Sequence, residues 1–213
     1  MENNKSMKKK VILNYPNLLH FLITIISLWL LIFFIRQDAF NYKFMAAAAL
    51  LALTWLPFGV EKLFKIKIPV VIILVYFYFL ILSLIGGVIF GLYIIFPWYD
   101  DFNHFLAGGL LTLLGIYIVS KLDNIGYLKF SLVVTYALFF AGFCAGIWEV
   151  SEFIISRIFA FDIQRVDVTG VNDTIIDIIM SFLGSAVILT LLLIDNKLYD
   201  NKYLEKLLKK FGD

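Results

Sequence analysis

Six long apolar runs alternate with short polar segments along this chain of 213 residues. A helix of about 20 apolar residues is long enough to cross the hydrocarbon core of a bilayer. The pattern therefore predicts an all-α, polytopic membrane bundle in one domain, residues 1–195. Its six transmembrane helices are expected at Leu18–Ile35, Phe44–Phe58 with an extension toward Phe64, Pro69–Phe96, Phe102–Ser120, Phe130–Ile155 and Thr174–Ile194.

Two of the runs contain residues that interrupt helices. Pro57 lacks the amide donor of a regular helical turn, so it is expected to kink or end the second helix. The third run has 28 residues, which is more than a span needs, and its helix is therefore expected to tilt or bend. Gly86, Gly87 and Gly91 are the natural place for that bend.

The last residues, 196–213, are polar and basic but keep apolar side chains at roughly helical spacing. This pattern predicts an amphipathic helix on the membrane surface, with its lysines toward the lipid headgroups. The spaced apolar residues are Leu198, Tyr203, Leu204, Leu207, Leu208 and Phe211.

Composition agrees with a membrane location. Hydrophobic residues make up 62% of the chain and the mean hydropathy is +0.93, far above the usual range of soluble domains. A net charge of +2 provides no strongly basic surface, so membrane lipids rather than nucleic acid are the expected partners. Cys144 is the only cysteine, which excludes an intrachain disulfide. Composition does not determine the oligomeric state.

Basic residues are distributed unevenly between the two sides that six spans define. The side with both termini carries four lysines in the amino-terminal tail, three in the 59–68 loop, two in the 121–129 loop and five in the carboxyl-terminal tail. These are 14 of the 18 Lys and Arg residues. Because basic loops stay in the cytoplasm, both termini are predicted to be cytoplasmic. The other side carries Arg36, Lys43, Arg157 and Arg165.

Four acidic residues flank one polar loop. Glu149 and Glu152 stand at the end of the fifth run, and Asp173 and Asp177 open the sixth, each pair spaced to share a helix face. With a rise of ~1.5 Å per residue, His104 and these acids reach one level near the outer interface of the membrane. Acids at membrane depth are costly and usually face a bundle interior, a partner or a cavity. This level is therefore the expected functional site.

Asp100 and His104 add a carboxylate and an imidazole one turn apart. They fit a metal-ligand pair, or a carboxylate that orients a general base. A helix start capped by Asp101 is the structural alternative. The whole cluster fits a divalent cation, with Mg²⁺, Mn²⁺ or Ca²⁺ favoured over Zn²⁺. The expected metal ligands are His104, Glu149, Glu152, Asp173 and Asp177, and the expected catalytic residues are His104, Asp100, Glu149 and Glu152.

Arg157 and Arg165 follow in the loop between the two acidic pairs. They are expected to bind an anionic substrate group, because a guanidinium pairs well with phosphate. The alternative is that both arginines neutralise the acids in a salt-bridged cluster.

The spacing of these residues resembles that of the YjdF family of bacterial inner-membrane proteins. A looser resemblance extends to VanZ-like proteins, although Asp101 stands where those have Lys. The resemblance implies a multi-pass protein of the bacterial cytoplasmic membrane with a shared polar site, and it implies no reaction. It covers about residues 97–190 and is carried by Tyr99-Asp100-x-x-x-His104-Phe105-x-x-Gly108, Glu149-x-x-Glu152, and Gly170-x-x-Asp173-Thr174-x-x-Asp177 followed by Gly184.

Three functions are compatible with these patterns. The first is a metal-dependent membrane enzyme that acts on a lipid or lipid-linked substrate at the outer leaflet, within the cell envelope. The second is a non-catalytic protein that binds or transports a cation or a basic solute. The third is a structural membrane protein whose acids form salt bridges. The sequence leaves open whether the protein is an enzyme.

Overall fold

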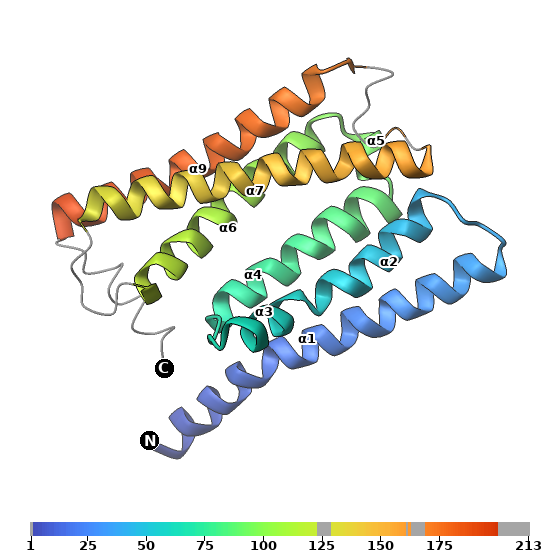
Figure 1. The fold of residues 1–213 in the computed structure, drawn as a ribbon. Coiled ribbons are helices and arrows are strands. Elements are labelled where there is room, and N and C mark those ends of the chain that lie inside the picture. Colours follow the sequence, from blue (N-terminus) through green and yellow to red (C-terminus); the bar gives the residue numbers. More distant parts are fainter. Residues whose placement is uncertain (1, 123–128, 161, 163–168, 200–213) are drawn as a thin grey trace. The chain divides into compact units, whose positions relative to one another are not determined.

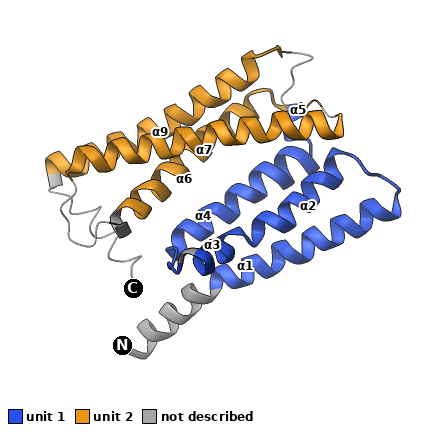
Figure 2. Cartoon of the chain, in the orientation of Figure 1, with its two compact units in different colours: residues 1–95, 212 blue, residues 96–211, 213 orange. Residues whose placement is uncertain are grey.

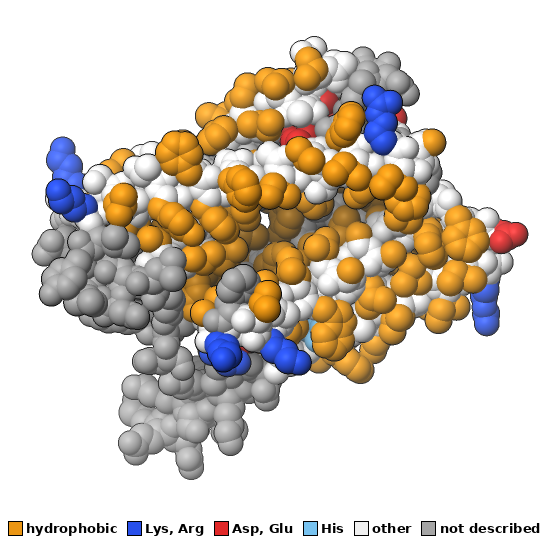
Figure 3. Space-filling model, in the orientation of Figure 1, with side chains coloured by type: hydrophobic (Ala, Val, Ile, Leu, Met, Phe, Trp, Pro, Cys, Tyr) orange, Lys and Arg blue, Asp and Glu red, His pale blue; other side chains and the backbone are white. Residues whose placement is uncertain are grey.

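A computed structural model of the chain describes residues 2–122, 129–160, 162 and 169–199. These residues form helices and contain no strand. Hydrophobic side chains cover the visible sides of the helices (Figure 3). The all-α membrane fold with six candidate spans is therefore confirmed. The stretches long and apolar enough to cross a membrane are Tyr15–Arg36, Tyr42–Leu63, Val70–Ile89, Trp98–Val119, Phe130–Phe159 and Asn172–Leu198.

The chain divides into two compact units, the first ending at Ile95 and the second beginning at Phe96 (Figure 1, Figure 2). The predicted boundary at residue 195 lies inside a helix that runs on to Tyr199, and residues 200–213 of the predicted amphipathic tail lie outside the described residues. The first unit contains α1 (Glu2–Arg36), α2 (Tyr42–Thr54), α3 (Leu56–Phe64), α4 (Val70–Leu80), η1 (Ile81–Ile89) and α5 (Leu92–Ile95). The second contains α6 (Trp98–Leu122), α7 (Phe130–Phe159) and α9 (Asn172–Tyr199).

The first unit packs α1, α2, α4 and η1 around an apolar core that includes Ile23, Leu50 and Phe77. α2 begins at Tyr42 because Asn41 caps it. The Asn41 side-chain oxygen accepts hydrogen bonds from the backbone amides of Lys43, at 3.0 Å, and Phe44, at 3.2 Å. The short link from α1 therefore ends in a defined helix start.

The second span is interrupted at Pro57, as predicted. α2 ends at Thr54, and α3 starts at Leu56 with Pro57 in its first turn. Proline has no amide hydrogen, so the carbonyl of Leu53, four residues earlier, cannot accept the regular α-helical hydrogen bond from residue 57. A backbone amide at the end of α2 and the Tyr76 hydroxyl, at 2.8 Å, donate to that carbonyl instead. A side chain of α4 thus supports the backbone where proline interrupts the helix.

The third span is shorter than the apolar run that contains it. α4 continues directly into a π-helix, η1, and the helix then stops at Ile89. Gly91 has a φ of +75°, a conformation that residues with a Cβ rarely adopt. Gly91, one of the three glycines expected to bend this helix, lies just beyond the end of the helix. Lys43 Nζ donates to the carbonyl of Ile89 at 3.0 Å, which satisfies one of the acceptors that a helix end exposes.

The second unit is built on buried residues that recur at every fourth position. On α7 these are Ala137, Ala141, Ala145 and Glu149. At one end of the stripe, Ala137 packs in an apolar cluster with Ile116 of α6 and with residues of α9. At the other end, Glu149 continues the stripe as a buried carboxylate. Glu149 therefore lies on the face of α7 that packs inside the unit.

Candidate functional site

α6 and α9 pack in a constant parallel register. The Ser181 hydroxyl of α9 donates to the carbonyl of His104, and the Ser185 hydroxyl donates to the carbonyl of Gly108, both at 3.2 Å. The two pairs share the same sequence separation of 77 residues. Continued by one turn toward the start of each helix, this register places Asp177 beside Asp100.

Two glycines allow the backbones of α6 and α9 to approach this closely. A Cβ at Gly108 would collide with the backbone carbonyl of Ser181, and a Cβ at Gly184 would collide with that of Phe105. A backbone carbonyl in a helix cannot move aside as a flexible side chain can. Glycine is therefore required at both positions, and the close packing brings the polar side chains of the first turns together.

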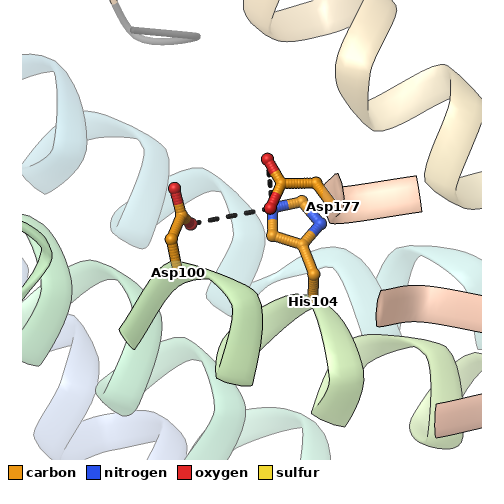
Figure 4. Close-up of side chains that lie close together, drawn as sticks. All are labelled: Asp100, His104 and Asp177. Carbon is orange, nitrogen blue, oxygen red and sulfur yellow. Dashed lines mark ion pairs between the residues drawn. The ribbon is translucent and has the colours of Figure 1, made fainter. Parts of the chain in front are cut away.

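The imidazole of His104 lies among three carboxylates. Nε2 is 3.7 Å from Oδ1 of Asp100 and 3.7 Å from Oδ2 of Asp177 (Figure 4). Nδ1, the other ring nitrogen, is 3.9 Å from Oε1 of Glu149 on α7. His104, Glu149 and Asp177 are buried, whereas Asp100 is half-buried. Residues from three helices thus meet at the shared depth that the sequence predicts.

Asp100, His104 and Asp177 form a group that could hold a metal ion, with one ligand atom from each lying within 4.8 Å of the others. Their nitrogen–oxygen distances of 3.7 Å exceed the ~3.2 Å limit of a good N–H···O hydrogen bond. Each pair of atoms is close enough for one ion with bonds of about 2.1–2.4 Å to contact both of them.

The structure favours one of the two roles that the sequence left open for Asp100. The sequence suggested that Asp100 and His104 form a metal-ligand pair, or that Asp100 is a catalytic carboxylate that orients a general base. An i,i+4 pair on a helix points to one side, and here Asp100 shares the Nε2 edge of His104 with Asp177. The geometry therefore makes Asp100 a candidate ligand.

Three of the predicted ligands, Glu149, Glu152 and Asp173, lie outside the three-residue group. Glu152 accepts a hydrogen bond from Trp148 Nε1 at 2.8 Å on the same helix, and it lies within electrostatic range of the carboxylates of the site. Asp173 is half-buried in the first turn of α9, where the helix dipole favours an acidic side chain. Metal ligation by Glu152 and Asp173 stays a prediction.

The predicted anion-binding arginines are placed differently by the structure. Arg157 lies in the last turn of α7 rather than in a loop, because the helix continues beyond the apolar run to Phe159. Its guanidinium carbon is 5.2 Å from the centre of the Phe153 ring. Arg165 lies outside the described residues. Binding of an anionic group by these arginines stays a prediction.

Sequence reasoning missed the polar residues that position the site. Besides the two serines of α9, Thr112 donates to the carbonyl of Gly108 at 2.8 Å. Asn103 is buried next to His104 in the chain and donates to the carbonyl of Tyr99 at 2.7 Å. The signal that was present is a four-residue spacing: Asp177, Ser181 and Ser185 on α9 repeat the interval of Asp100, His104, Gly108 and Thr112 on α6.

The family model described as Predicted membrane protein (DUF2238) matches residues 17–197 of the chain. The chain belongs to this family. DUF2238 is the YjdF family, so that resemblance is confirmed. The matched residues include His104 and the three carboxylates around it, Asp100, Glu149 and Asp177. The description of the family names no reaction. No curated protein and no solved structure matches the chain.

Proposed function

We propose that this DUF2238 protein binds a divalent metal ion within the membrane at Asp100, His104 and Asp177. The observation that supports the proposal is the placement of three ligand atoms within 4.8 Å of one another by two helices. Two neighbouring carboxylates in an apolar bundle are costly unless a cation or protons compensate their charge. A bound cation compensates both and uses the imidazole as a third ligand.

The donor set favours a hard cation. Carboxylate oxygens are the ligands preferred by Mg²⁺, Mn²⁺ and Ca²⁺, whereas Zn²⁺ sites are usually richer in His and Cys. With one imidazole and two carboxylates, the site resembles the first group more than the second. We therefore propose Mg²⁺, Mn²⁺ or Ca²⁺ before Zn²⁺.

Three protein ligands leave coordination positions open for water and substrate. A metal ion in such a site polarises a phosphoryl or carbonyl oxygen and activates a bound water. The proposed activity is therefore that of a metal-dependent enzyme of the cell envelope acting on an anionic lipid or lipid-linked substrate. Glu152 is the proposed general base, and Arg157 is the proposed partner of a phosphate group.

The site is proposed to face the outer leaflet of the bacterial cytoplasmic membrane. The supporting observation is that 14 of the 18 Lys and Arg residues fall on the side that carries both termini. The test uses single cysteines in a chain with Cys144→Ser. A cysteine at the exposed Trp98 is expected to react with an impermeant reagent added to intact cells, and cysteines at 122–127 are expected to stay protected. The reverse pattern would move the site to the cytoplasmic face.

Elemental analysis of protein purified in mild detergent tests the metal directly. After dialysis against Mn²⁺ and removal of free ion, wild type is expected to retain one ion per chain and Asp177→Asn to retain none. Asp195→Asn is the matched control, because Asp195 is also a buried aspartate of α9 but lies 18 residues further along the helix. Wild-type protein that refuses Mg²⁺, Mn²⁺, Ca²⁺ and Zn²⁺ would overturn the proposal.

Turnover separates an enzyme from a cation-binding protein. Metal-loaded wild type is expected to convert at least one member of a panel of phospholipids and polyprenyl phosphates, and Asp177→Asn is expected to be inactive. Bound metal without turnover across the panel would make the protein a cation-binding protein instead.

A further inference from the structure

His104 has carboxylates at both of its ring nitrogens. Nε2 faces Asp100 and Asp177 at 3.7 Å each, while Nδ1 faces Oε1 of Glu149 at 3.9 Å. The lone pairs of the two ring nitrogens diverge, so an ion held at Nε2 lies across the ring from Glu149. Glu149 is accordingly outside the group of ligand atoms that lie within 4.8 Å of one another.

We infer that Glu149 is a positioning residue for His104 and that it is not a metal ligand. Its carboxylate accepts a hydrogen bond from Nδ1–H and so presents the bare Nε2 to the ion, an inference that rests on the proposed metal site. A neutral imidazole carries its proton on one nitrogen, and only the other nitrogen can bind a metal. Carboxylates commonly fix ligating histidines in this way.

The surroundings hold both partners in place. The hydrogen bond from Ser181 at 3.2 Å holds the backbone of His104. The orientation of the imidazole ring then depends on the groups that interact with its two nitrogens. Glu149 projects from the same buried stripe as Ala145, one turn earlier on α7. The distance of 3.9 Å between Nδ1 and Oε1 is about 1 Å longer than a hydrogen bond, so the inferred bond requires the two side chains to move that much closer.

Two substitutions of Glu149 distinguish positioning from ligation. Gln keeps an oxygen that accepts a hydrogen bond from Nδ1–H but loses the negative charge of a good ligand, whereas Leu loses both. A positioning role predicts that Glu149→Gln changes Mn²⁺ affinity only slightly, while Glu149→Leu weakens it about 10- to 100-fold. A ligand role predicts comparable losses for both. Ser151→Ala is the control, because the Ser151 hydroxyl bonds to its own helix at the carbonyl of Ile147 and the affinity should not change.

Nitrogen-15 NMR of histidine-labelled protein in micelles reports on the ring itself. The chain has two histidines, and His20→Asn leaves the signals of His104 alone. With ¹¹³Cd²⁺ as the probe ion, scalar coupling is expected to Nε2 in wild type and in Glu149→Gln, with the proton on Nδ1 beside Glu149.

The outcomes separate this inference from the proposal beneath it. Cadmium coupling to Nδ1, or equal losses of Mn²⁺ affinity in Glu149→Gln and Glu149→Leu, would overturn the positioning role. A wild-type protein that binds neither Mn²⁺ nor Cd²⁺ would overturn the metal site, and the inference that rests on it would fall with that site. If Glu149→Leu does not fold, Glu149→Gln and the cadmium coupling decide the question.

Discussion

The two compact units use their ionisable side chains in different ways. In the first unit the second span is interrupted at Pro57 and the third ends at Ile89, and the side chains of Tyr76 and Lys43 donate hydrogen bonds to the carbonyls of Leu53 and Ile89 near these points. In the second unit, α6, α7 and α9 run without interruption over the described residues. Their ionisable side chains meet one another around His104 instead.

This difference separates structural polar residues from functional ones. Within a membrane every buried polar group needs a partner, and a broken helix offers its own backbone groups as partners. Tyr76 and Lys43 are explained in this way without any ligand. Continuous helices satisfy their own backbone, so several carboxylates facing one imidazole call for a compensating charge. A cation is the simplest source of that charge.

The largest expected effect concerns the close packing of α6 and α9. Gly108→Ala should destabilise the second unit by about 3 kcal/mol, because the added Cβ collides with a backbone carbonyl that cannot relax. Gly109→Ala is the control, since its Cβ would lie 3.5 Å from its nearest neighbour, an ordinary contact. The free energy of unfolding in micelles measures both. Equal losses at the two positions would show that the close approach is not required.

The next effect tests whether the meeting of ionisable groups needs a cation. At Mn²⁺ concentrations 100 times the dissociation constant, wild type should gain about 2.7 kcal/mol of stability, and Asp177→Asn should gain none. In EDTA, Asp177→Asn should be at least as stable as wild type, because one of the crowded carboxylates has lost its charge. Thermal unfolding with EDTA and with Mn²⁺ measures both differences. A similar gain from Mn²⁺ in both proteins would place the ion elsewhere.

The stability of the first unit should depend on the hydrogen bond from Tyr76 and not on bound metal. Tyr76→Phe removes the side-chain hydrogen bond to the carbonyl of Leu53, which keeps its backbone donor at the end of α2, and should cost about 1.5 kcal/mol with no change in Mn²⁺ affinity. In a Pro57→Ala background the loss should be smaller, because the amide of residue 57 can then donate to the same carbonyl. The unfolding midpoints of wild type, the two single variants and the double variant form a double-mutant cycle. If the two losses of stability were strictly additive, the amide of residue 57 would not compensate for the Tyr76 hydroxyl.

The smallest effect concerns the end of η1. Lys43→Met removes a charged donor from the carbonyl of Ile89 and should cost about 1 kcal/mol. Lys62→Met is the control and should cost only about 0.3 kcal/mol, because this exposed lysine in the last turn of α3 interacts weakly with its own helix end. The comparison uses the same unfolding measurement. If both variants lose the same amount, the contact of Lys43 with the helix end contributes nothing of its own.

The number and order of spans could be predicted from the length of the apolar runs, and the interruption at Pro57 from the chemistry of proline. The end of the third span could not be located among Gly86, Gly87 and Gly91, because a sequence does not reveal which glycine adopts a positive φ. The end of α7 was placed at Ile155, four residues early, because the apolar run ends before the helix does. Arg157 was consequently expected in a loop.

For the site, helix rise was sufficient to predict that His104, Glu149 and Asp177 share a depth. It could not assign the two edges of the imidazole, because the edge that a neighbour meets depends on helix rotation and on side-chain rotamers. The choice between a ligand role and an orienting role for Asp100 was therefore left open. Ser181 was missed because a serine in an apolar helix has many roles, and its partner, the carbonyl of His104, becomes visible only in the packed unit.

The position of a bound ion is the most direct test of the central claim. Crystals of wild-type protein grown with Mn²⁺ would be measured near the manganese absorption edge, and an anomalous difference map would be calculated. The account predicts one peak in the second unit, on the Nε2 side of His104 and within bonding distance of Asp100 and Asp177. A map with no peak among these three residues while Mn²⁺ is bound elsewhere in the second unit, or with no peak in that unit at all, would contradict it.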